Sequence, residues 1–256
     1  MTPARGTVAI TMAGMGNRFT AAGYTQPKYE IEVLGSPLFD WSLSALSAFQ
    51  SEGWLFQFAT RRETQALPFL TSRCAALGIP MGEVLQLDRL TDGQATTAYL
   101  LAEMADPRAP FLVFNIDTYV RPEAMRPDQI PDGASGWIPC FPGPGTGWSF
   151  ARIDEANRAL ELREKKRISP HATVGLYWFQ SAERYISLYE EFFGGGGEEM
   201  GERYIAPMYN HLIERGEDVY VSLLEFDDVG MLGTPEQVAA FSARPPVTID
   251  RTAFSK

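Results

Sequence analysis

The sequence predicts an α/β protein with a Rossmann-like three-layer α/β/α fold, in which a mainly parallel central sheet carries a smaller antiparallel extension. Strand and helix patterns alternate through the first half, and its strands are continuous apolar runs such as Phe-Leu-Val-Phe. The second half instead contains strands that short turns join. Alternating strands and helices form right-handed crossovers onto a parallel sheet, whose central strands are apolar on both faces.

The elements of the first half follow from the spacing of their apolar residues. Thr7–Met12 is a continuous apolar strand, and Pro37–Phe49 has apolar residues at helical spacing. The next expected elements are a strand at Trp54–Ala59, a helix at Glu63–Leu77, a strand at Glu83–Leu87, a helix at Gln94–Met104 and a strand at Phe111–Asn115.

The second half begins with strands and ends with helices. Thr234-Pro-Glu suits a helix start, because proline fits the first turn. The expected strands are Gly136–Phe141, Ser149–Ile153, Leu160–Arg163, Thr173–Phe179 and Asp218–Leu224, and the expected helices are Ala182–Phe193, Tyr204–Arg215 and Thr234–Phe241. The length of 256 residues predicts one domain, 1–256, with halves at about 1–135 and about 136–256.

Composition and charge exclude several classes of protein. The net charge of −10 disfavours a nucleic-acid-binding protein, which would carry a basic surface. No apolar run approaches the roughly 20 residues that span a bilayer. Cys74 and Cys140 lie far apart in apolar contexts, which predicts buried free thiols and a cytoplasmic protein. The two histidines are too few and too scattered for a zinc site.

A glycine-rich turn follows the first strand and is the most informative motif of the chain. Gly14 and Gly16 let backbone N–H groups close around phosphate oxygens, and Arg18 and Lys28 add positive charge. The dinucleotide fingerprint needs a third glycine where Phe19 stands, and the Walker pattern needs a Gly-Lys pair that is absent here. The remaining readings are a polyphosphate site and a tight turn without a ligand.

The pattern G-x-G-x-R-F followed by Pro27-Lys28 resembles the signature of the sugar-phosphate nucleotidyltransferases, the nucleoside-diphosphate-sugar pyrophosphorylases, which have a GT-A-type nucleotide-binding fold. The resemblance continues in order from Ile10 to about Val238, and it implies a nucleotide-binding first half and an acceptor-binding second half. The further blocks are Leu90–Ala98, Asn115–Asp117, Glu164-Lys165 with Gly175, Glu202–Pro207 and Phe226–Glu236.

The resemblance implies Mg²⁺ as the cofactor, held by Asp117 and Asp228. Asp117 follows an apolar strand, so it should lie at the carboxyl edge of the sheet, where ligands of open α/β sheets bind. Magnesium prefers carboxylates together with phosphate oxygens and water. Met231-Leu232 is an apparent insertion in the late block, which leaves Asp227 as the alternative to Asp228. Each aspartate also fits a turn without a ligand.

The resemblance also implies the residues that bind the two substrates. Arg18, Lys28 and Lys165 are the expected catalytic residues, which stabilise the charge of the phosphates. The expected nucleotide-binding residues are Ala13, Gly14, Met15, Gly16, Asn17, Gln86 and Gly93, and the expected acceptor-binding residues are Lys165, Lys166, Gly175 and Glu202.

The implied reaction condenses a nucleoside triphosphate with a sugar 1-phosphate or a similar phosphorylated acceptor, in an enzyme of the small capsule or surface-polysaccharide type. The compact first loop favours CTP or dTTP. The alternatives are a GT-A-like glycosyltransferase that uses a nucleotide sugar, and a non-catalytic regulatory protein that binds one. The sequence leaves the oligomeric state open, a homo-oligomer included.

Overall fold

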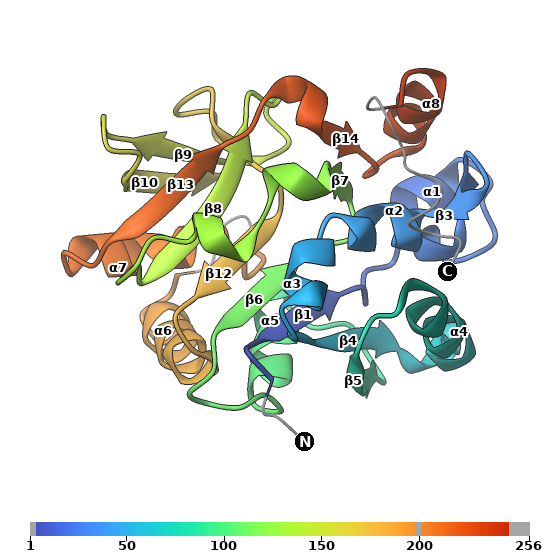
Figure 1. Cartoon of the computed structure of the whole chain (residues 1–256), viewed down its shortest axis with the longest axis horizontal. Coiled ribbons are helices and arrows are strands. Elements are labelled where there is room, and N and C mark those ends of the chain that lie inside the picture. Colours follow the sequence, from blue (N-terminus) through green and yellow to red (C-terminus); the bar gives the residue numbers. More distant parts are fainter. Residues whose placement is uncertain (1–3, 198–200, 246–256) are drawn as a thin grey trace.

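The computed structural model describes residues 4–197 and 201–245, and its centre is a sheet that begins with four parallel strands. These are β1 (Thr7–Thr11), β4 (Leu55–Arg61), β5 (Met81–Leu87) and β6 (Phe111–Phe114), in the spatial order β6-β1-β4-β5. In Figure 1, β5 lies at one end of this sheet, next to helix α4 (Leu67–Leu77). The carboxyl ends of the parallel strands all reach one edge.

The sheet continues through the second half of the chain, where antiparallel pairs dominate. Strand β12 (Leu176–Phe179) is antiparallel to both β6 and β8 (Gly136–Phe141), while β13 (Val219–Leu223) is parallel to β8. Strands β9 (Ser149–Ile153), β10 (Ala159–Glu164) and β11 (Ala172–Thr173) complete the far end. The predicted α/β class, with a mainly parallel sheet and an antiparallel extension, is confirmed.

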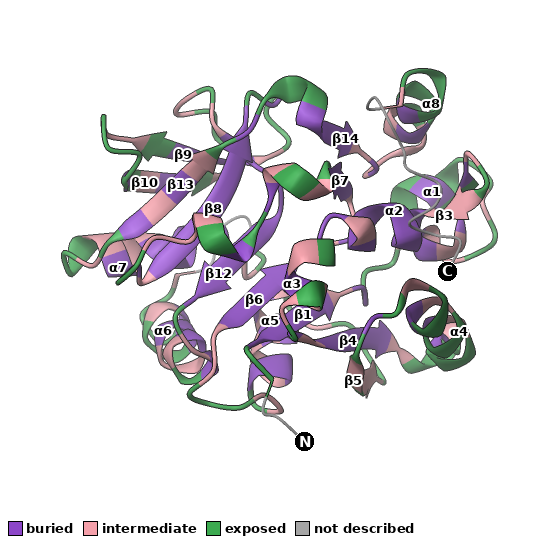
Figure 2. Cartoon of the chain, in the orientation of Figure 1, coloured by how far each residue is buried: buried purple, intermediate pink, exposed green. Residues whose placement is uncertain are grey.

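Helices cover both faces of the sheet, because successive strand residues point to opposite sides. Val8 and Ile10 of β1 pack with α2 (Leu38–Ser44), α3 (Ser47–Ser51) and α4, whereas Ala9 packs with α5 (Gln94–Ala102), α6 (Ala182–Gly194) and α7 (Tyr209–Glu214). The central strands β6 and β8 are buried along their length in Figure 2. The two clusters give the three-layer arrangement.

Helix boundaries differ from the predicted ones where the backbone leaves the helical region. Pro37–Phe49 is divided at Leu46, whose ψ of 13° interrupts the helix, and Glu63–Leu77 begins only after Gln65, which has a φ of 48°. The predicted start at Thr234 is confirmed, because its side chain caps α8 (Pro235–Ala243) by accepting a hydrogen bond from the Gln237 backbone at 3.2 Å. No helix within residues 4–197 and 201–245 is long and apolar enough to cross a membrane.

A third hydrophobic cluster lies beyond the sheet and was not predicted. Two short strands, β7 (Thr118–Val120) and β14 (Val229–Met231), pair there in antiparallel fashion. Three residues are too few to show a period, which explains why the sequence did not reveal these strands. The cluster comprises Phe19, Ile31, Val33, Leu38, Trp41, Tyr119, Leu232, Val238 and Phe241. It joins α1 (Asn17–Ala21), α2 and α8 to the β7–β14 pair.

The remaining elements are short connections. They are the strand pair β2 (Glu32–Val33) and β3 (Ser36–Pro37), and the 3₁₀ turns η1 (Lys28–Glu30), η2 (Arg62–Thr64), η3 (Pro122–Ala124), η4 (Pro127–Gln129), η5 (Ala206–Met208) and η6 (Phe226–Asp228). Turn η5, with Pro207 inside it, occupies the first part of the helix predicted at Tyr204–Arg215, so α7 begins only at Tyr209.

Candidate active site

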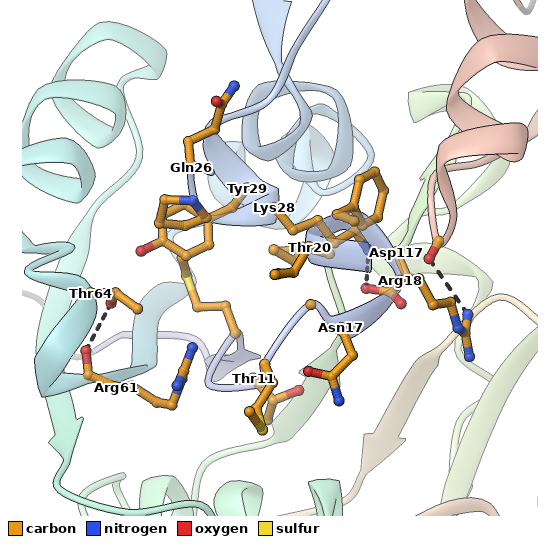
Figure 3. A pocket seen from close by; sticks show the side chains of 18 of the residues that line it. Thr11, Asn17, Arg18, Thr20, Gln26, Lys28, Tyr29, Arg61, Thr64 and Asp117 are labelled. Carbon is orange, nitrogen blue, oxygen red and sulfur yellow. Dashed lines mark hydrogen bonds and ion pairs between the residues drawn. The ribbon is translucent and has the colours of Figure 1, made fainter. Parts of the chain in front are cut away.

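A cleft of about 800 Å³ opens at the carboxyl edge of the parallel strands (Figure 3). The glycine-rich loop after β1 passes through its middle, and the segment after β6 forms one wall. Its lining residues are Thr11, Met12, Gly14, Met15, Gly16, Asn17, Arg18, Phe19, Thr20, Thr25, Gln26, Pro27, Lys28, Tyr29, Arg61, Glu63, Thr64, Ile116, Asp117 and Gly233. The edge of an open α/β sheet is where such folds bind ligands.

The loop leaves room for a ligand at its glycines. A Cβ on Gly14 would meet no atom within 4 Å, so nothing in the protein itself requires glycine there. Gly16 adopts the left-handed conformation at φ 64° and starts α1 by accepting a hydrogen bond from the Phe19 backbone at 2.9 Å. The open space at Gly14 suits the close approach of an anion to the backbone.

An ion pair joins the two walls of the cleft. Lys28 Nζ donates to Asp117 Oδ1 at 2.5 Å, and Figure 3 shows the two side chains pointing toward each other. The Lys28 side chain is 12% exposed and that of Asp117 is 47% exposed, so the carboxylate remains accessible from the cleft. Arg18 Nη1 donates to the Gly233 carbonyl at 3.5 Å on the same side. Arg18, Lys28 and Asp117 thus line one cleft.

Asp117 owes its position to the backbone on either side of it. Its carbonyl accepts a hydrogen bond from the Leu232 backbone at 2.8 Å, at the end of the β7–β14 pair. The backbone of Asn115, two residues earlier, donates to the Gly175 carbonyl at 3.3 Å. Gly175 has a φ of 84°, and a Cβ there would come within 2.4 Å of the Asn115 amide, so only glycine fits.

The structure does not bring Asp228 to Asp117. Asp228 faces Arg121 across the far end of the β7–β14 pair, four residues or about 13 Å along the strands from Asp117. Its side chain is 9% exposed and forms an ion pair with Arg121, while Oδ2 accepts from the Glu225 backbone at 3.2 Å. Residues 229–231 belong to β14 rather than to a turn, and this strand carries Asp228 away from the cleft. Asp227 is exposed on η6.

Three predicted nucleotide contacts lie outside the lining of the cleft. Ala13 is 7% exposed, and Gln86 on β5 accepts a hydrogen bond from Arg62 at 3.4 Å. Gly93 precedes α5, and a Cβ there would lie 2.4 Å from the carbonyl oxygen of Arg203. Close packing therefore explains the glycine at position 93, and its contact with a nucleobase stays a prediction.

The predicted acceptor residues form a separate cluster around Tyr204. Lys165 Nζ donates to Tyr204 Oη at 2.7 Å and lies 4.7 Å from the centre of the ring. Burial, followed by the hydrogen bond to the Glu202 carboxylate, raises the pKa of Tyr204, so the phenol stays protonated. Lys165 and Glu202 are thus brought together through a residue that the sequence did not single out, and Lys166 is exposed beside them.

The segment before Tyr204 ties this cluster to the nucleotide-binding half. The Arg203 backbone donates to the Asp92 carbonyl at 2.9 Å and accepts from the Ala95 backbone at 3.0 Å. Arg203 Nε also pairs with Asp92 Oδ2 at 3.1 Å. Residues 202–204 therefore contact the start of α5 on one side and Lys165 on the other.

Sequence reasoning missed several residues of the cleft. Arg61 ends β4, the strand beside β1, and Glu63 and Thr64 follow it, while Tyr29 follows Lys28 directly. The one available signal was position, because Arg61 ends a parallel strand at the ligand-binding edge. Gly233, which the sequence presents only as part of the late block, lines the cleft beside Asp117.

Comparison with known proteins is consistent with this geometry. No protein-family model matches the chain, and no curated protein does either. The crystal structure of a nucleoside-diphosphate-sugar pyrophosphorylase from Vibrio cholerae matches with a TM-score of 0.83 and 33% identity, over 93% of this chain and 100% of that one. The chain belongs to the nucleoside-diphosphate-sugar pyrophosphorylase family of nucleotidyltransferases. This relationship agrees with a cleft in which Arg18, Lys28 and Asp117 lie around a glycine-rich loop.

Two more distant nucleotidyltransferases share the fold. An inositol-1-phosphate CTP transferase from T. maritima has a TM-score of 0.74 at 14% identity, over 97% of this chain and 100% of that one. A CTP:phosphocholine cytidylyltransferase from Streptococcus pneumoniae has a TM-score of 0.71 at 17% identity, over 93% of this chain and 98% of that one. The whole length of this nucleotidyltransferase thus follows one known architecture.

Replacing Gly14 with alanine tests whether the loop holds the nucleotide. Because the new Cβ meets no protein atom, we expect Gly14→Ala to change the free energy of unfolding by less than about 1 kcal/mol. The methyl group would occupy the space of a phosphate, so the Kd for nucleoside triphosphate should rise about tenfold, or about 1.4 kcal/mol. Urea unfolding and calorimetric titration measure the two quantities.

Two other glycines serve as controls. Gly194→Ala also adds a methyl group in open space and should leave the triphosphate Kd unchanged, while the free energy of unfolding rises by less than about 1 kcal/mol because alanine favours the helix. Gly175→Ala should instead lower the free energy of unfolding by about 1–3 kcal/mol, because its backbone conformation and the neighbouring Asn115 both exclude a side chain. A wild-type Kd in Gly14→Ala would mean that phosphates do not approach this loop.

Proposed function

We propose that this nucleotidyltransferase condenses a nucleoside triphosphate with a sugar 1-phosphate or a similar phosphorylated acceptor and releases pyrophosphate. The observation that carries the proposal is the placement of Arg18, Lys28 and Asp117 around one cleft beside an open glycine loop. An acceptor phosphate oxygen forms a bond to the α-phosphorus, and the bond between the α- and β-phosphates breaks as pyrophosphate takes its electron pair.

The chemistry requires positioning and charge neutralisation rather than a catalytic base. The attacking phosphate oxygen is already anionic near neutral pH, and two anions must meet in one cleft, where their repulsion is strong. Lys28 contacts the α-phosphate, while Arg18 and the backbone of Gly14 and Gly16 hold the β- and γ-phosphates. The 12% exposure of the Lys28 side chain strengthens its interaction with an anion, because little water screens it.

A magnesium ion fits this site through one carboxylate. Asp117 is half exposed at the cleft; Oδ1 meets Lys28, and Oδ2 lies on the Gly233 side. Among residues 4–197 and 201–245, no three His, Cys, Asp or Glu side chains gather into a metal-binding group. Magnesium commonly takes one or two carboxylates and completes its shell with phosphate oxygens and water. When bound, it supplies positive charge to the reacting phosphates, and Asp117 is the residue that holds it.

The acceptor binds at the cluster that Lys165, Tyr204 and Glu202 form. Lys165 carries the charge that binds the acceptor phosphate, and Lys166 adds a second cation beside it. Tyr204 holds the Lys165 ammonium by a hydrogen bond of 2.7 Å and by its ring face. Gly175 packs against Asn115, two residues before Asp117.

The finer features of the proposal are the nucleotide and the biological setting. The names of two structures that share the fold specify CTP as the substrate, which supports CTP over GTP and UTP for this chain. The other candidate is dTTP. A cytoplasmic enzyme that makes activated precursors for a capsule or surface polymer is consistent with these substrates.

The test incubates the chain with each of four triphosphates, magnesium and a panel of phosphorylated acceptors, and measures released pyrophosphate. If none of the four triphosphates gave pyrophosphate release, the proposal would be rejected.

Asp117→Asn tests the metal-binding carboxylate. The nearly isosteric change removes the charge that holds magnesium, so we expect kcat/KM to fall at least about 100-fold. The half-exposed pair with Lys28 contributes little stability, so the free energy of unfolding should change by less than about 1 kcal/mol. The Kd for triphosphate, measured by calorimetric titration with and without magnesium, should no longer depend on magnesium in this variant.

Asp228→Asn is the matched control. It breaks the ion pair between the buried Asp228 carboxylate and the half-exposed Arg121, so it should lower the free energy of unfolding by about 1–3 kcal/mol, while the folded variant keeps wild-type magnesium dependence. If Asp228→Asn abolished the magnesium dependence and Asp117→Asn kept it, the metal would belong to Asp228.

Lys165→Ala tests the acceptor site. Removing the ammonium should raise the acceptor KM about 10- to 100-fold and leave the triphosphate KM within about twofold. Lys166→Ala removes the same charge one residue away and should raise the acceptor KM less than about threefold, because Tyr204 holds the ammonium of Lys165 in the cluster. A larger effect at Lys166 would transfer the phosphate contact to that residue.

A further inference from the structure

The turn that precedes α5, residues 91–95, is in contact with the cleft through Gln94. The side-chain amide of Gln94 donates to the Thr11 hydroxyl at 3.0 Å, and Thr11 lines the cleft at the end of β1. The Thr91 hydroxyl donates to the Gly93 carbonyl at 2.9 Å and so closes the turn. The position of this α5 turn therefore affects the wall of the cleft beside Thr11.

The backbone of Arg203 takes part in the start of α5. Gly93 has no side chain that could cap this helix, and the first N–H groups of a helix have no partner within it. The Arg203 carbonyl accepts a hydrogen bond from the Ala95 backbone at 3.0 Å, and the Arg203 N–H donates to the Asp92 carbonyl at 2.9 Å. A residue from the second half of the chain thus holds the α5 turn on both sides of Gly93.

The side chain of Arg203 joins the same turn to α6. Nε pairs with Asp92 Oδ2 at 3.1 Å, and Nη1 donates to Tyr189 Oη at 2.7 Å. The guanidinium also lies 5.7 Å and 5.2 Å from the ring centres of Tyr189 and Phe193, within the range of a cation–π interaction. A planar guanidinium offers several donors in fixed directions, so it can meet the carboxylate and the phenol together, which a lysine ammonium does less well.

Tyr204, the next residue, leads from Arg203 to the acceptor cluster. Its hydroxyl accepts a hydrogen bond from Lys165 Nζ at 2.7 Å. Adjacent Cα atoms are about 3.8 Å apart across a planar peptide bond, so a displacement of Arg203 also displaces Tyr204. The contacts of one residue therefore affect both the α5 turn and the ammonium of Lys165.

We propose that Arg203 is a positioning residue for both substrates. It holds the α5 turn against Thr11 at the triphosphate site, and through Tyr204 it holds the Lys165 ammonium at the acceptor site. The proposal rests on the proposed function for the identity of the two substrates. Arg203 lies outside the lining of the cleft, so its replacement removes no charge from the cleft itself.

Arg203→Met tests this role, because methionine keeps much of the length of the side chain and removes its donors. Calorimetric titration in magnesium chloride with each of the four triphosphates identifies the one that the wild-type chain binds, and its Kd should rise about three- to tenfold in the variant. The KM of the acceptor that supports pyrophosphate release should rise by a similar factor. Arg203→Lys restores the charge beside Asp92 but not all the contacts, so both values should rise only about two- to threefold.

Two further variants separate positioning from stability. Arg184→Met removes an arginine of α6 that is 23% exposed, against 27% for Arg203, and that pairs with Glu217. Because Arg184→Met and Arg203→Met each break a partly buried ion pair, both should lower the Tm, whereas Arg184→Met should keep the wild-type Kd and KM. Tyr204→Phe removes only the hydroxyl that holds Lys165, so it should raise the acceptor KM about three- to tenfold and leave the triphosphate Kd within about twofold.

Three results would overturn the positioning role. These are a wild-type triphosphate Kd in Arg203→Met that circular dichroism shows to be folded, weaker binding of only one of the two substrates, and an equal loss in Arg184→Met. If Arg203→Met does not fold, wild-type values in Arg203→Lys reject the role in the same way.

The proposed function fails separately. If Arg203→Met weakens the binding of a triphosphate but the wild-type chain releases pyrophosphate with no acceptor, Arg203 positions the triphosphate site and the reaction is rejected. If transfer proceeds and Arg203→Met keeps the wild-type values for both substrates, only the positioning role is rejected.

Discussion

The ion pair between Lys28 and Asp117 joins segments 89 residues apart and brings the two walls of the cleft into contact. One partner belongs to the chain that returns from the glycine-rich loop, and the other follows the central strand β6. Both reach the same edge because β1 and β6 are parallel neighbours. A site that brings two phosphates together needs positive charge on one side and a cation-binding carboxylate on the other, and this pair places them within contact.

The β7–β14 strand pair is the second constraint on the site. It places the Leu232 backbone in hydrogen-bond contact with the Asp117 carbonyl and brings Gly233 to the cleft. The side chain of Leu232 packs in the third hydrophobic cluster. The same pairing holds Asp228 at the far end with Arg121. Gly233, after one end of β14, therefore lines the cleft, while Asp228, before the other end, lies outside it, which leaves Asp117 as the ligand of the proposed metal.

Residues 202–204 connect the start of α5 with Lys165 of the proposed acceptor site. Arg203 binds the backbone on both sides of Gly93, and the next residue, Tyr204, binds Lys165. A shift of this segment at either site would move the other, because the backbone between adjacent residues is short and has few free torsions. A side chain at Gly93 would clash with Arg203, and one at Gly175 would clash with Asn115. The close contacts at these two positions therefore depend on glycine.

The sequence by itself determined the α/β class, the order of the main strands and the loop with Arg18 and Lys28, because apolar periodicity and a glycine motif are local properties of the chain. It also located Asp117, since a polar residue after an apolar strand must lie at the sheet edge. Only the tertiary structure decided that Asp228 lies apart from Asp117, that Tyr204 joins Lys165 to Glu202, and that Arg61 lines the cleft. Each of these depends on which distant segments pair, and three-residue strands and single side chains leave no periodic signal from which that pairing can be read.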